Sequence, residues 1–296
     1  MPLRHDFRRG AALMLAATAL FAVMGALVKD AVSRIPFAEV MFFRAALALP
    51  VVLLLAWRGQ GRPELRTRRF PQHVLRACTG TAAMGCSFWS LGVLPLAEQT
   101  ALTYTTPIFA ALLAVPFLGE RIGLWRALGV GVGFAGILVI ALGKGAFGGA
   151  MTGLVLIGMA MATLHGLFSG LTTLLVRSLS ATERSSTIVL WQSILMTAIT
   201  GLVMPFVWVT PGWGELKVLL LIGIIGGVAQ VLLTEAYASA QVSSLGAFSY
   251  TGVLWAVLIG WLAFGEEQRW MTFAGAGLIV LAGLAILRGE MRRQPR

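Results

Sequence analysis

Arg44 is the charged side chain whose position points most directly to a binding role. It lies seven residues into an apolar run that begins near residue 37. An arginine inside a run of membrane-spanning length normally faces protein or water, because lipid cannot solvate its charge. Its guanidinium can hold a substrate carboxylate, or it can pair with Glu39 or a backbone carbonyl. These alternatives remain open, and Arg44 is a candidate substrate-binding residue.

Amide and hydroxyl side chains inside other apolar runs extend this set. Gln192 occupies the position in the second half of the chain that Arg44 occupies in the first, so a fixed cation is needed only once. Gln230 and Thr234 are four residues apart and therefore share one face of a helix. We expect all three side chains to face a cavity rather than lipid.

Aromatic side chains at two pairs of positions could form the walls of such a cavity. Tyr104 and Tyr250 are two of only three tyrosines, and each offers an aromatic wall and a hydroxyl for substrate amino or carboxylate groups. Thr100 lies one helical turn before Tyr104 on the same face. Trp89 and Trp191 lie further inside their runs than Trp57, Trp125, Trp208, Trp213 and Trp270. The alternatives are interhelical packing for the tyrosines and lipid contact for the tryptophans.

Pro107 and His165 suggest a hinge and a proton-coupling group. Pro107 leaves the carbonyl of Thr103 without its helical partner, and a threonine hydroxyl can compensate. The helix there either moves during transport or carries a static kink. His165 titrates in the physiological range and precedes Ser169 by four residues on the same face. A lone histidine in a helix is also commonly a structural hydrogen-bonding residue.

The sequence contains no motif for catalysis, metal binding or ATP hydrolysis. There is no HExxH, no clustered His/Asp set and no Ser–Lys pair at helical spacing. The glycine-rich stretch GKGAFGGA does not match the phosphate-binding pattern GxxxxGK[ST]. Cys78 and Cys86 are eight residues apart on one expected helix, which is too far for a disulfide. We therefore expect neither an enzyme nor a bound cofactor or metal.

The composition indicates an all-α integral membrane protein. The chain has 296 residues, of which 58% are hydrophobic and only 12% charged, about half the charged fraction of a soluble protein. The first apolar run continues to Val28, longer than the core of a signal peptide, so we expect a retained first helix. The net charge of +11 lies in connections and termini, which favours membrane topology over nucleic-acid binding.

Ten apolar segments, each long enough to cross a bilayer, can be marked. They lie at roughly residues 9–28, 37–57, 73–93, 97–118, 123–142, 151–175, 185–208, 215–238, 244–265 and 270–288. With the N-terminus inside, 17 of the 23 Lys and Arg residues fall on the inner side, Arg76 among them, and five on the outer side. This bias predicts that both termini are cytoplasmic.

The two halves of the chain repeat each other in opposite orientations. A shift of 146 residues places Tyr104 on Tyr250 and Gly119-Glu120 on Gly265-Glu266. Five segments lie on each side of a glycine-rich linker, so the second copy enters the membrane from the opposite face. We predict two inverted five-helix repeats, over residues 5–143 and 151–290, joined by a linker at 144–150.

These features resemble the drug/metabolite transporter superfamily and, more narrowly, its EamA-type branch. The resemblance rests on Leu118-Gly119-Glu120 followed by glycines at 129, 131, 133 and 136, and on Phe264-Gly265-Glu266 followed by Gly275 and Gly277. It implies ten helices around a central cavity, with helices 5 and 10 peripheral. Family members move amino acids, S-adenosylmethionine, riboflavin, nucleotide derivatives or drugs. The second half lacks the proline, since Val253 occupies the Pro107 position.

The expected function is secondary transport of small metabolites across a bacterial inner membrane by alternating access. Within the resemblance we favour amino-acid export, including aromatic amino acids. An importer or exchanger of a larger metabolite such as riboflavin or S-adenosylmethionine is the alternative, and a channel or membrane scaffold is the competing class. The expected partners are a small-molecule substrate and the lipid bilayer. Gly129 and Gly133 indicate close helix contact, either within the chain or in a homodimer.

Overall fold

The computed structural model describes residues 7–60, 65–118, 124–143, 153–180, 182–183, 185–239, 248, 250–267 and 269–291. The linker expected at 144–150 and the repeated Glu120 lie outside these ranges. Regular structure in the described ranges is entirely helical. The helices are α1 (Phe7–Val32), α2 (Phe37–Gln60), α3 (Phe70–Leu91), α4 (Leu96–Thr103), α5 (Thr106–Leu118), α6 (Leu124–Gly143), α7 (Gly153–Ser180), α8 (Ser185–Val207), α9 (Trp213–Ser239), α11 (Thr251–Phe264) and α12 (Trp270–Met291).

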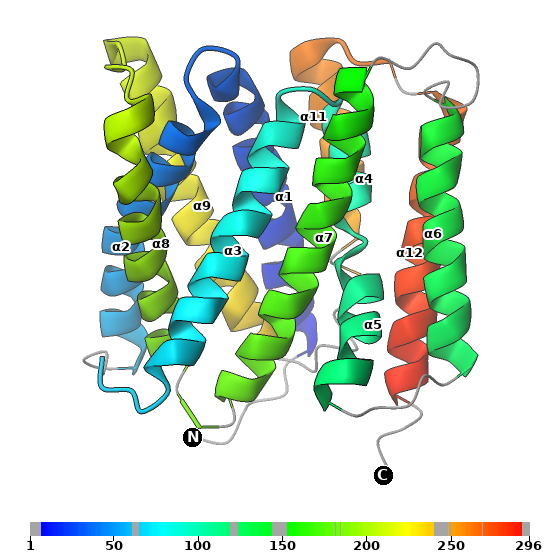
Figure 1. Cartoon of the computed structure of the whole chain (residues 1–296), viewed down its shortest axis with the longest axis horizontal. Helices are drawn as coiled ribbons and strands as arrows, with labels where there is room; N and C mark the ends of the chain where they lie inside the picture. Colours follow the sequence, from blue (N-terminus) through cyan, green and yellow to red (C-terminus); the bar gives the residue numbers. More distant parts are fainter. Residues whose placement is uncertain are drawn as a thin grey trace.

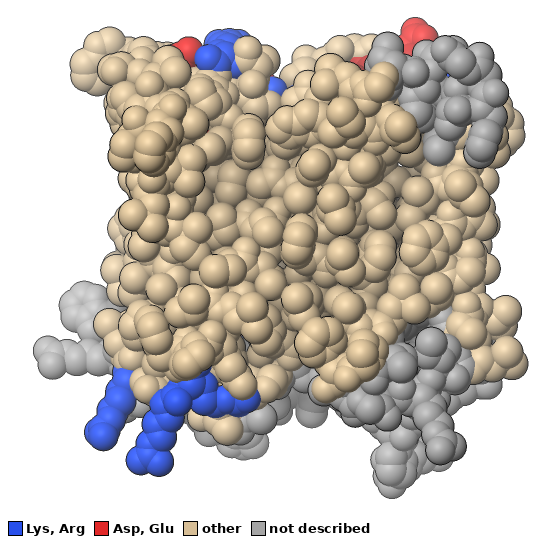
Figure 2. All heavy atoms as spheres, in the orientation of Figure 1, with Lys and Arg blue, Asp and Glu red and all other residues tan. Residues whose placement is uncertain are grey.

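The helices stand side by side in a bundle whose two ends carry the charged side chains. Figure 2 shows basic side chains at both ends of the visible face, acidic ones at the upper end, and an uncharged belt between them. Large apolar side chains point outward in this belt, for example Leu202 and Phe206, which are 76% and 86% exposed. Such exposure is stable only where lipid replaces water. The chain is therefore a multi-pass membrane protein.

Length and composition agree with this conclusion. Among the described residues, five stretches are long and apolar enough to cross a membrane on their own. They are Arg8–Val32, Phe37–Leu54, Gly153–Val176, Thr187–Val207 and Trp213–Leu233. Helix α3 falls short of this class because it carries His73, Arg76 and several hydroxyl side chains. Its polar residues are accommodated by α7 and α8, against which it packs.

The two halves of the fold are inverted, as the sequence predicted. Helix α1 begins at the face where α12 ends, whereas α7 begins at the other face (Figure 1). We name the first the terminal face and the second the opposite face. Helix α1 contacts α9 and α11, and its counterpart α7 contacts α3 and the α4–α5 pair. Three other helices contact their own counterparts in the second half: α2 contacts α8, α4 contacts α11, and α6 contacts α12. The ten segments thus form two interlocked five-segment repeats.

The fourth segment is broken, whereas the sequence suggested one helix over 97–118. Helix α4 ends at Thr103 and α5 begins at Thr106. The break has a local cause, because Pro107 has no N–H to donate to the carbonyl of Thr103. The hydroxyl of Thr106 donates to that carbonyl instead, at 2.9 Å. The hydroxyl compensation expected from the sequence is therefore present.

Helices α6 and α12 form a peripheral pair at one side of the bundle (Figure 1). Glycines allow their backbones to approach closely. A Cβ built on Gly136 would lie 2.7 Å from the carbonyl oxygen of Gly275, and one built on Gly275 would lie 2.7 Å from the carbonyl oxygen of Gly136. The glycine-rich fifth helix therefore makes close contacts within the chain, which is one of the two alternatives its glycines suggested.

Candidate functional site

A narrow pocket lies between the central parts of α2, α8 and α9. Its cavity volume is about 20 Å³, room for one or two water molecules. The lining residues come from three neighbouring helices, of which α2 and α8 stand at one side of the bundle (Figure 1). They are Arg44, Ala45, Ala48, Val52, Val189, Gln192, Ser193, Met196, Gly226, Gly227 and Gln230. Three residues singled out in the sequence, Arg44, Gln192 and Gln230, therefore line the same pocket.

Small side chains create this space at the contact between α2 and α9. A Cβ built on Gly227 would lie 3.1 Å from Cβ of Val51 and 3.4 Å from Cα of Ala48. A Cβ built on Gly226 would lie 3.5 Å from Nε of Arg44 and 2.8 Å from Sδ of Met24. These glycines let the two helices approach while leaving room for one long side chain, and that side chain is Arg44.

Among the residues that the structure describes, Arg44 has no partner for its charge. Among the described residues it makes no hydrogen bond or ion pair, and its Nε is buried without an acceptor. Glu39, the partner considered from the sequence, is fully buried and directed elsewhere. Its Oε2 accepts a hydrogen bond from the backbone N–H of Val209 at 3.0 Å. A guanidinium held in a central pocket without a counter-charge is costly, and it is suited to receive an anion from outside.

Two amides add hydrogen-bonding capacity beside this cation. The Nε2 of Gln192 lies 3.3 Å from Sδ of Met196, one turn further along α8. A Cβ built on Gly80 of α3 would lie 3.3 Å from the same nitrogen, so Gln192 lies between α3 and the pocket. Gln230 lines the pocket from α9. An amide can both donate and accept, so the pocket can meet an anionic group together with neutral polar groups.

Tyr104 and Tyr250 meet each other in the other half of the bundle. Their ring centroids are 5.3 Å apart at an interplanar angle of 55°. Tyr104 directly follows α4, and Tyr250 directly precedes α11, so both lie at ends of helices. A Cβ on Gly252 would collide with the hydroxyl of Tyr104, and one on Gly283 would collide with that of Tyr250. The repeated tyrosines thus form one aromatic contact across the pseudo-twofold axis.

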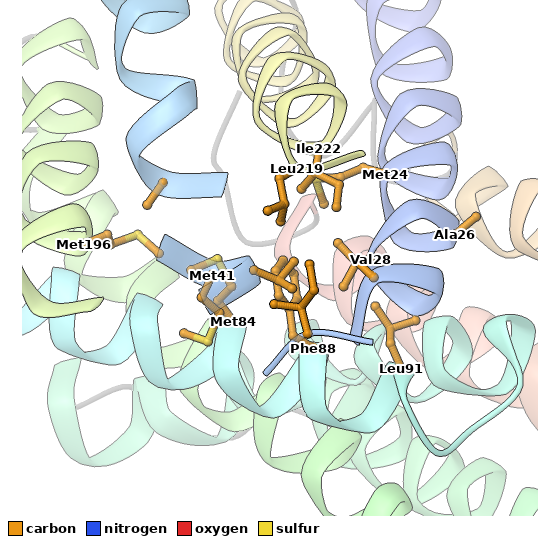
Figure 3. Close-up of a cluster of buried hydrophobic side chains, with 14 of the residues drawn as sticks. Met24, Ala26, Val28, Met41, Met84, Phe88, Leu91, Met196, Leu219 and Ile222 are labelled. Carbon is orange, nitrogen blue, oxygen red and sulfur yellow. The ribbon is translucent and has the colours of Figure 1, made fainter. Parts of the chain in front are cut away.

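An apolar cluster closes the pocket toward the opposite face. Met24, Met41, Met84 and Met196 belong to it together with Phe88, and Figure 3 shows the cluster formed by side chains from α1, α2, α3, α8 and α9. Met196 also lines the pocket. Methionine is unbranched and can repack around a changing shape, so this cluster can seal the pocket in one arrangement and part in another.

An ion pair closes the same face above this cluster. Nζ of Lys29, near the end of α1, lies 2.7 Å from Oε1 of Glu266 and donates to the carbonyl of Leu94 at 2.6 Å. The backbone N–H of Leu96 donates to the other carboxylate oxygen of Glu266 at 2.8 Å. Gly265 ends α11 with φ of 61°, a left-handed turn that suits glycine and directs the next residue back across the bundle. This geometry explains the Gly-Glu motif in the second half.

Another polar cluster closes the terminal face. One oxygen of the Glu183 carboxylate accepts from Nε2 of His73 at 2.6 Å, and the other accepts from the hydroxyl of Thr67. Nη1 of Arg69 donates to the carbonyl of Ser178 at 2.7 Å, and Nη2 donates to its hydroxyl at 2.8 Å. These bonds join the segment before α3 to the end of α7. Polar contacts therefore join helices at both faces of the bundle in this structure.

The family follows from a comparison with known protein families. The model of the EamA-like transporter family matches residues 8–142 and again residues 156–288. The two matches together cover most of the chain. The chain belongs to the EamA-like transporter family.

Characterised relatives of this EamA-like protein are transporters of different substrates. It is 35% identical to a riboflavin transporter of Rhizobium johnstonii over 79% of its own length and 76% of the relative's. It is 29% identical to the pseudopaline exporter CntI of Pseudomonas aeruginosa, over 95% and 96% of the two chains. An S-adenosylmethionine uptake transporter of Rickettsia bellii is 27% identical over 88% and 87%. The chain is thus a membrane transporter, as expected, and these names do not establish amino-acid export.

A solved crystal structure shares the fold of this EamA-like transporter. The two structures superpose with a TM-score of 0.69 over 98% of this chain and 100% of the other, at 18% sequence identity. At this level of identity the match concerns the fold alone. It agrees with the all-helical architecture of ten segments.

The other predicted site residues whose side chains are described are not among those that line the pocket. The indole N–H of Trp191 donates to the carbonyl of Leu65 at 3.1 Å, and its ring packs against Phe70. His165 donates through Nδ1 to the carbonyl of Ala83 at 2.9 Å, which is the structural alternative. Trp89 on α3, Thr100 on α4 and Ser169 on α7 are half-buried. Thr234 lies on α9 and Pro107 on α5, but their side chains are not among the described ones.

Sequence reasoning missed several residues of the pocket and its closures. Ser193, Met196, Gly226 and Gly227 line the pocket but are ordinary residues of an apolar helix. For Ser193, the sequence offers one indication of a place in the pocket, namely that it follows Gln192 directly. Arg76 was counted with the basic residues of the inner connection, whereas the structure places it inside α3 with only 6% of its surface exposed. A charge within an expected helical segment was the signal that could have found it.

We expect Glu266→Gln to lower the stability of the closed transporter measurably. Both side chains of the Lys29–Glu266 pair are largely shielded from solvent, at 19% and 11% exposure. Removing one charge leaves the other partly buried, at a cost of about 1–3 kcal/mol. The adjacent exposed residue provides a matched control, so Glu267→Gln should have little effect. Thermal unfolding in detergent measures both, and equal unfolding temperatures for the two variants would show that the pair does not hold the closure.

Proposed function

We propose that this protein is a secondary transporter of a small, carboxylate-bearing metabolite, an amino acid or a compound derived from one. The observation that carries the proposal is the guanidinium of Arg44, which lines the pocket without a partner in the described part of the chain. A guanidinium presents paired N–H donors that match the two oxygens of a carboxylate. A cargo carboxylate at Arg44 would neutralise the charge that the protein leaves unbalanced. This would make the loaded pocket more stable than the empty one.

The amides beside Arg44 support recognition of a polar cargo. Gln192 and Gln230 approach the pocket from α8 and α9, so amino, hydroxyl or amide groups of a substrate would find donors and acceptors there. The characterised relatives transport compounds of diverse size, which is consistent with a pocket that reshapes around its cargo. The cavity of about 20 Å³ is too small for any such cargo, so binding requires the helices to separate.

The proposed mechanism is alternating access between the two faces. Separation of the Lys29–Glu266 pair and of the methionine cluster would open the opposite face. Separation of the Glu183 cluster would open the terminal face. The inverted repeats supply matching helices for both movements. In this mechanism Tyr104, Tyr250 and Thr100 line the widened path, and the break beside Pro107 acts as a hinge. Trp89, Trp191, His165, Ser169 and Thr234 would meet the cargo only in open states.

Riboflavin is a second candidate cargo, because the riboflavin transporter of Rhizobium johnstonii is 35% identical to this chain. Its fused ring carries carbonyl and ring-nitrogen acceptors that Arg44 and the two glutamines could hydrogen-bond. This candidate differs from the first in one testable respect. A neutral ring would need hydrogen bonds from Arg44 rather than charge neutralisation, so transport would depend less on the positive charge itself.

The proposed setting is a bacterial inner membrane with both termini in the cytoplasm. The excess of Lys and Arg in connections on the terminal face supports this orientation. Export of amino acids, the direction favoured from the sequence, would then proceed from the terminal face to the opposite face.

Counterflow in liposomes tests the proposed function. Purified protein is reconstituted into vesicles loaded with one unlabelled compound, and uptake of the same labelled compound is followed for amino acids, S-adenosylmethionine and riboflavin. We expect saturable uptake, stimulated by internal substrate, for at least one carboxylate-bearing compound. Protein-free vesicles provide the baseline. Flux that rises linearly with concentration would indicate a channel, and uptake of riboflavin alone would favour the second candidate.

A further inference from the structure

Arg76 is a second buried cation without a counter-charge. It lies on α3, 6% exposed, and its Nε is buried without a hydrogen-bond partner. Its one contact within the described residues is a long hydrogen bond of 3.3 Å from Nη1 to the carbonyl of Ile188 on α8. A charged side chain nine-tenths buried normally has an ion-pair partner or several strong hydrogen bonds. Arg76 has neither.

Glu183, the acidic residue of the terminal-face cluster, already accepts hydrogen bonds from other side chains. Glu183 lies five residues before Ile188 along the chain, and its carboxylate receives hydrogen bonds from His73 and Thr67. No ion pair within 4 Å joins Arg76 to an acid among the described residues. The neighbouring basic residue Arg69 is occupied by Ser178 and Thr182. Within the described ranges the charge of Arg76 is thus left without compensation, as is that of Arg44.

Arg76 lies beside the terminal-face end of the pocket. Arg76 and Gly80 are one turn apart on α3, and they face Ile188 and Gln192, which are one turn apart on α8. Gln192 lines the pocket. Because Arg76 contacts Ile188, one turn before Gln192, the level of Arg76 is about 5.4 Å from this pocket residue along the axis of α8.

Arg44 lies further toward the opposite face than Arg76, so the two cations lie at different levels along the helix axes. It shares its end of the pocket with Gly226 and Met196. Ile188 and Met196 are eight positions apart on α8, which corresponds to about 12 Å along the helix axis. The guanidinium of Arg44 therefore lines one end of the pocket, whereas that of Arg76 lies outside the lining, near the level of the other end, with the amide of Gln192 between the two levels.

We infer that the cargo carries at least two anionic groups, one bound by Arg44 and a second bound by Arg76. The inference rests on the proposed function, because it assumes that Arg44 holds a carboxylate. Separating α3 from α8 as the cargo enters would turn Arg76 from the carbonyl of Ile188 toward the pocket. The two charges that the protein leaves unbalanced are then neutralised by the same molecule. A dicarboxylate, or an amino acid with an acidic side chain, has this chemistry.

Matched pairs of compounds test this inference on the purified full-length protein. Glutamate is compared with glutamine, and succinate with its monoamide succinamate, because each pair differs chiefly in one carboxylate. Apparent dissociation constants come from the ligand-dependent rise in unfolding temperature. For the wild-type protein we expect the compound with two carboxylates to bind at least about tenfold more tightly than its amide counterpart in at least one of the two pairs. Equal binding within both pairs, or binding of none, would overturn the inference.

Variants separate the two cations. Arg76→Gln should abolish the preference for the second carboxylate while preserving binding of the amide, and Arg76→Lys should restore part of it. Arg66→Gln, which changes an exposed arginine nearby, should leave the preference intact. Arg44→Gln should weaken both members of a pair equally. A preference that survives Arg76→Gln refutes the role of Arg76 alone, whereas unchanged binding by Arg44→Gln refutes the proposed function as well.

Discussion

Arg44→Gln is expected to reduce saturable transport by about tenfold or more while making the empty protein more stable. Charge-assisted hydrogen bonds to a bound carboxylate contribute about 1.5–3 kcal/mol, which corresponds to roughly 10- to 100-fold in affinity. The same guanidinium lacks any protein partner within the described residues, and its Nε is buried. Replacing an uncompensated charge by a neutral amide removes a desolvation cost. Loss of function should therefore accompany a gain in stability, which a purely structural arginine would not show.

Counterflow and thermal unfolding on the same preparations measure the two effects. Arg34→Gln is the control, because Arg34 is 58% exposed and pairs with Asp30 on the surface. It should alter neither quantity appreciably. Arg44→Lys keeps the charge without the paired donors and should retain intermediate activity for a carboxylate. If Arg44→Gln unfolds at a lower temperature than the wild type, Arg44 stabilises the bundle and its assignment to the substrate is wrong.

Gly136→Leu is expected to destabilise the protein by about 3 kcal/mol. A Cβ at this position would lie 2.7 Å from the carbonyl oxygen of Gly275 and 3.1 Å from the backbone nitrogen of Ile279. Backbone atoms cannot move aside without separating α6 from α12. A leucine must therefore push the two helices apart and lose the packing between them.

Gly131→Leu on the same helix is the matched control. Nothing lies within 4 Å of a Cβ built at Gly131, and the residue is exposed on the outer surface of α6. This variant should unfold near the wild-type temperature. Thermal unfolding of both variants in detergent compares the positions directly. Equal loss at the two glycines would mean that the close contact of α6 and α12 does not contribute to stability.

The architecture was predictable because a membrane simplifies the physics. Apolar runs separated by charged connections define ten segments, and an odd number in each half requires inversion. Arg44, Gln192 and Gln230 were identifiable for the same reason, since polar side chains in apolar runs must face something polar. All three side chains line one pocket. Their roles in binding remain predictions.

Other parts of the site depend on contacts that a single helix does not reveal. Lys29 and Glu266 are far apart in the chain and meet only when α1 and α11 pack together. Trp191 and Gln192 are adjacent, yet the first contacts the connection before α3 and the second lines the pocket. Successive residues on a helix differ by about 100° in direction, so a small rotation decides which of them faces the pocket. That rotation is set by packing with other helices.

The small pocket also makes the surrounding lipid part of the transport machinery. A bound metabolite typically needs a site of at least about 300 Å³, whereas the closed cavity has about 20 Å³. Widening it must displace α2, α8 and α9 outward, and residues of α8 and α9 such as Phe206 and Trp213 are largely exposed on the bundle surface. Each cycle would then perform work against the lateral pressure of the bilayer. Tighter lipid packing should consequently slow turnover even when the affinity for the cargo is unchanged.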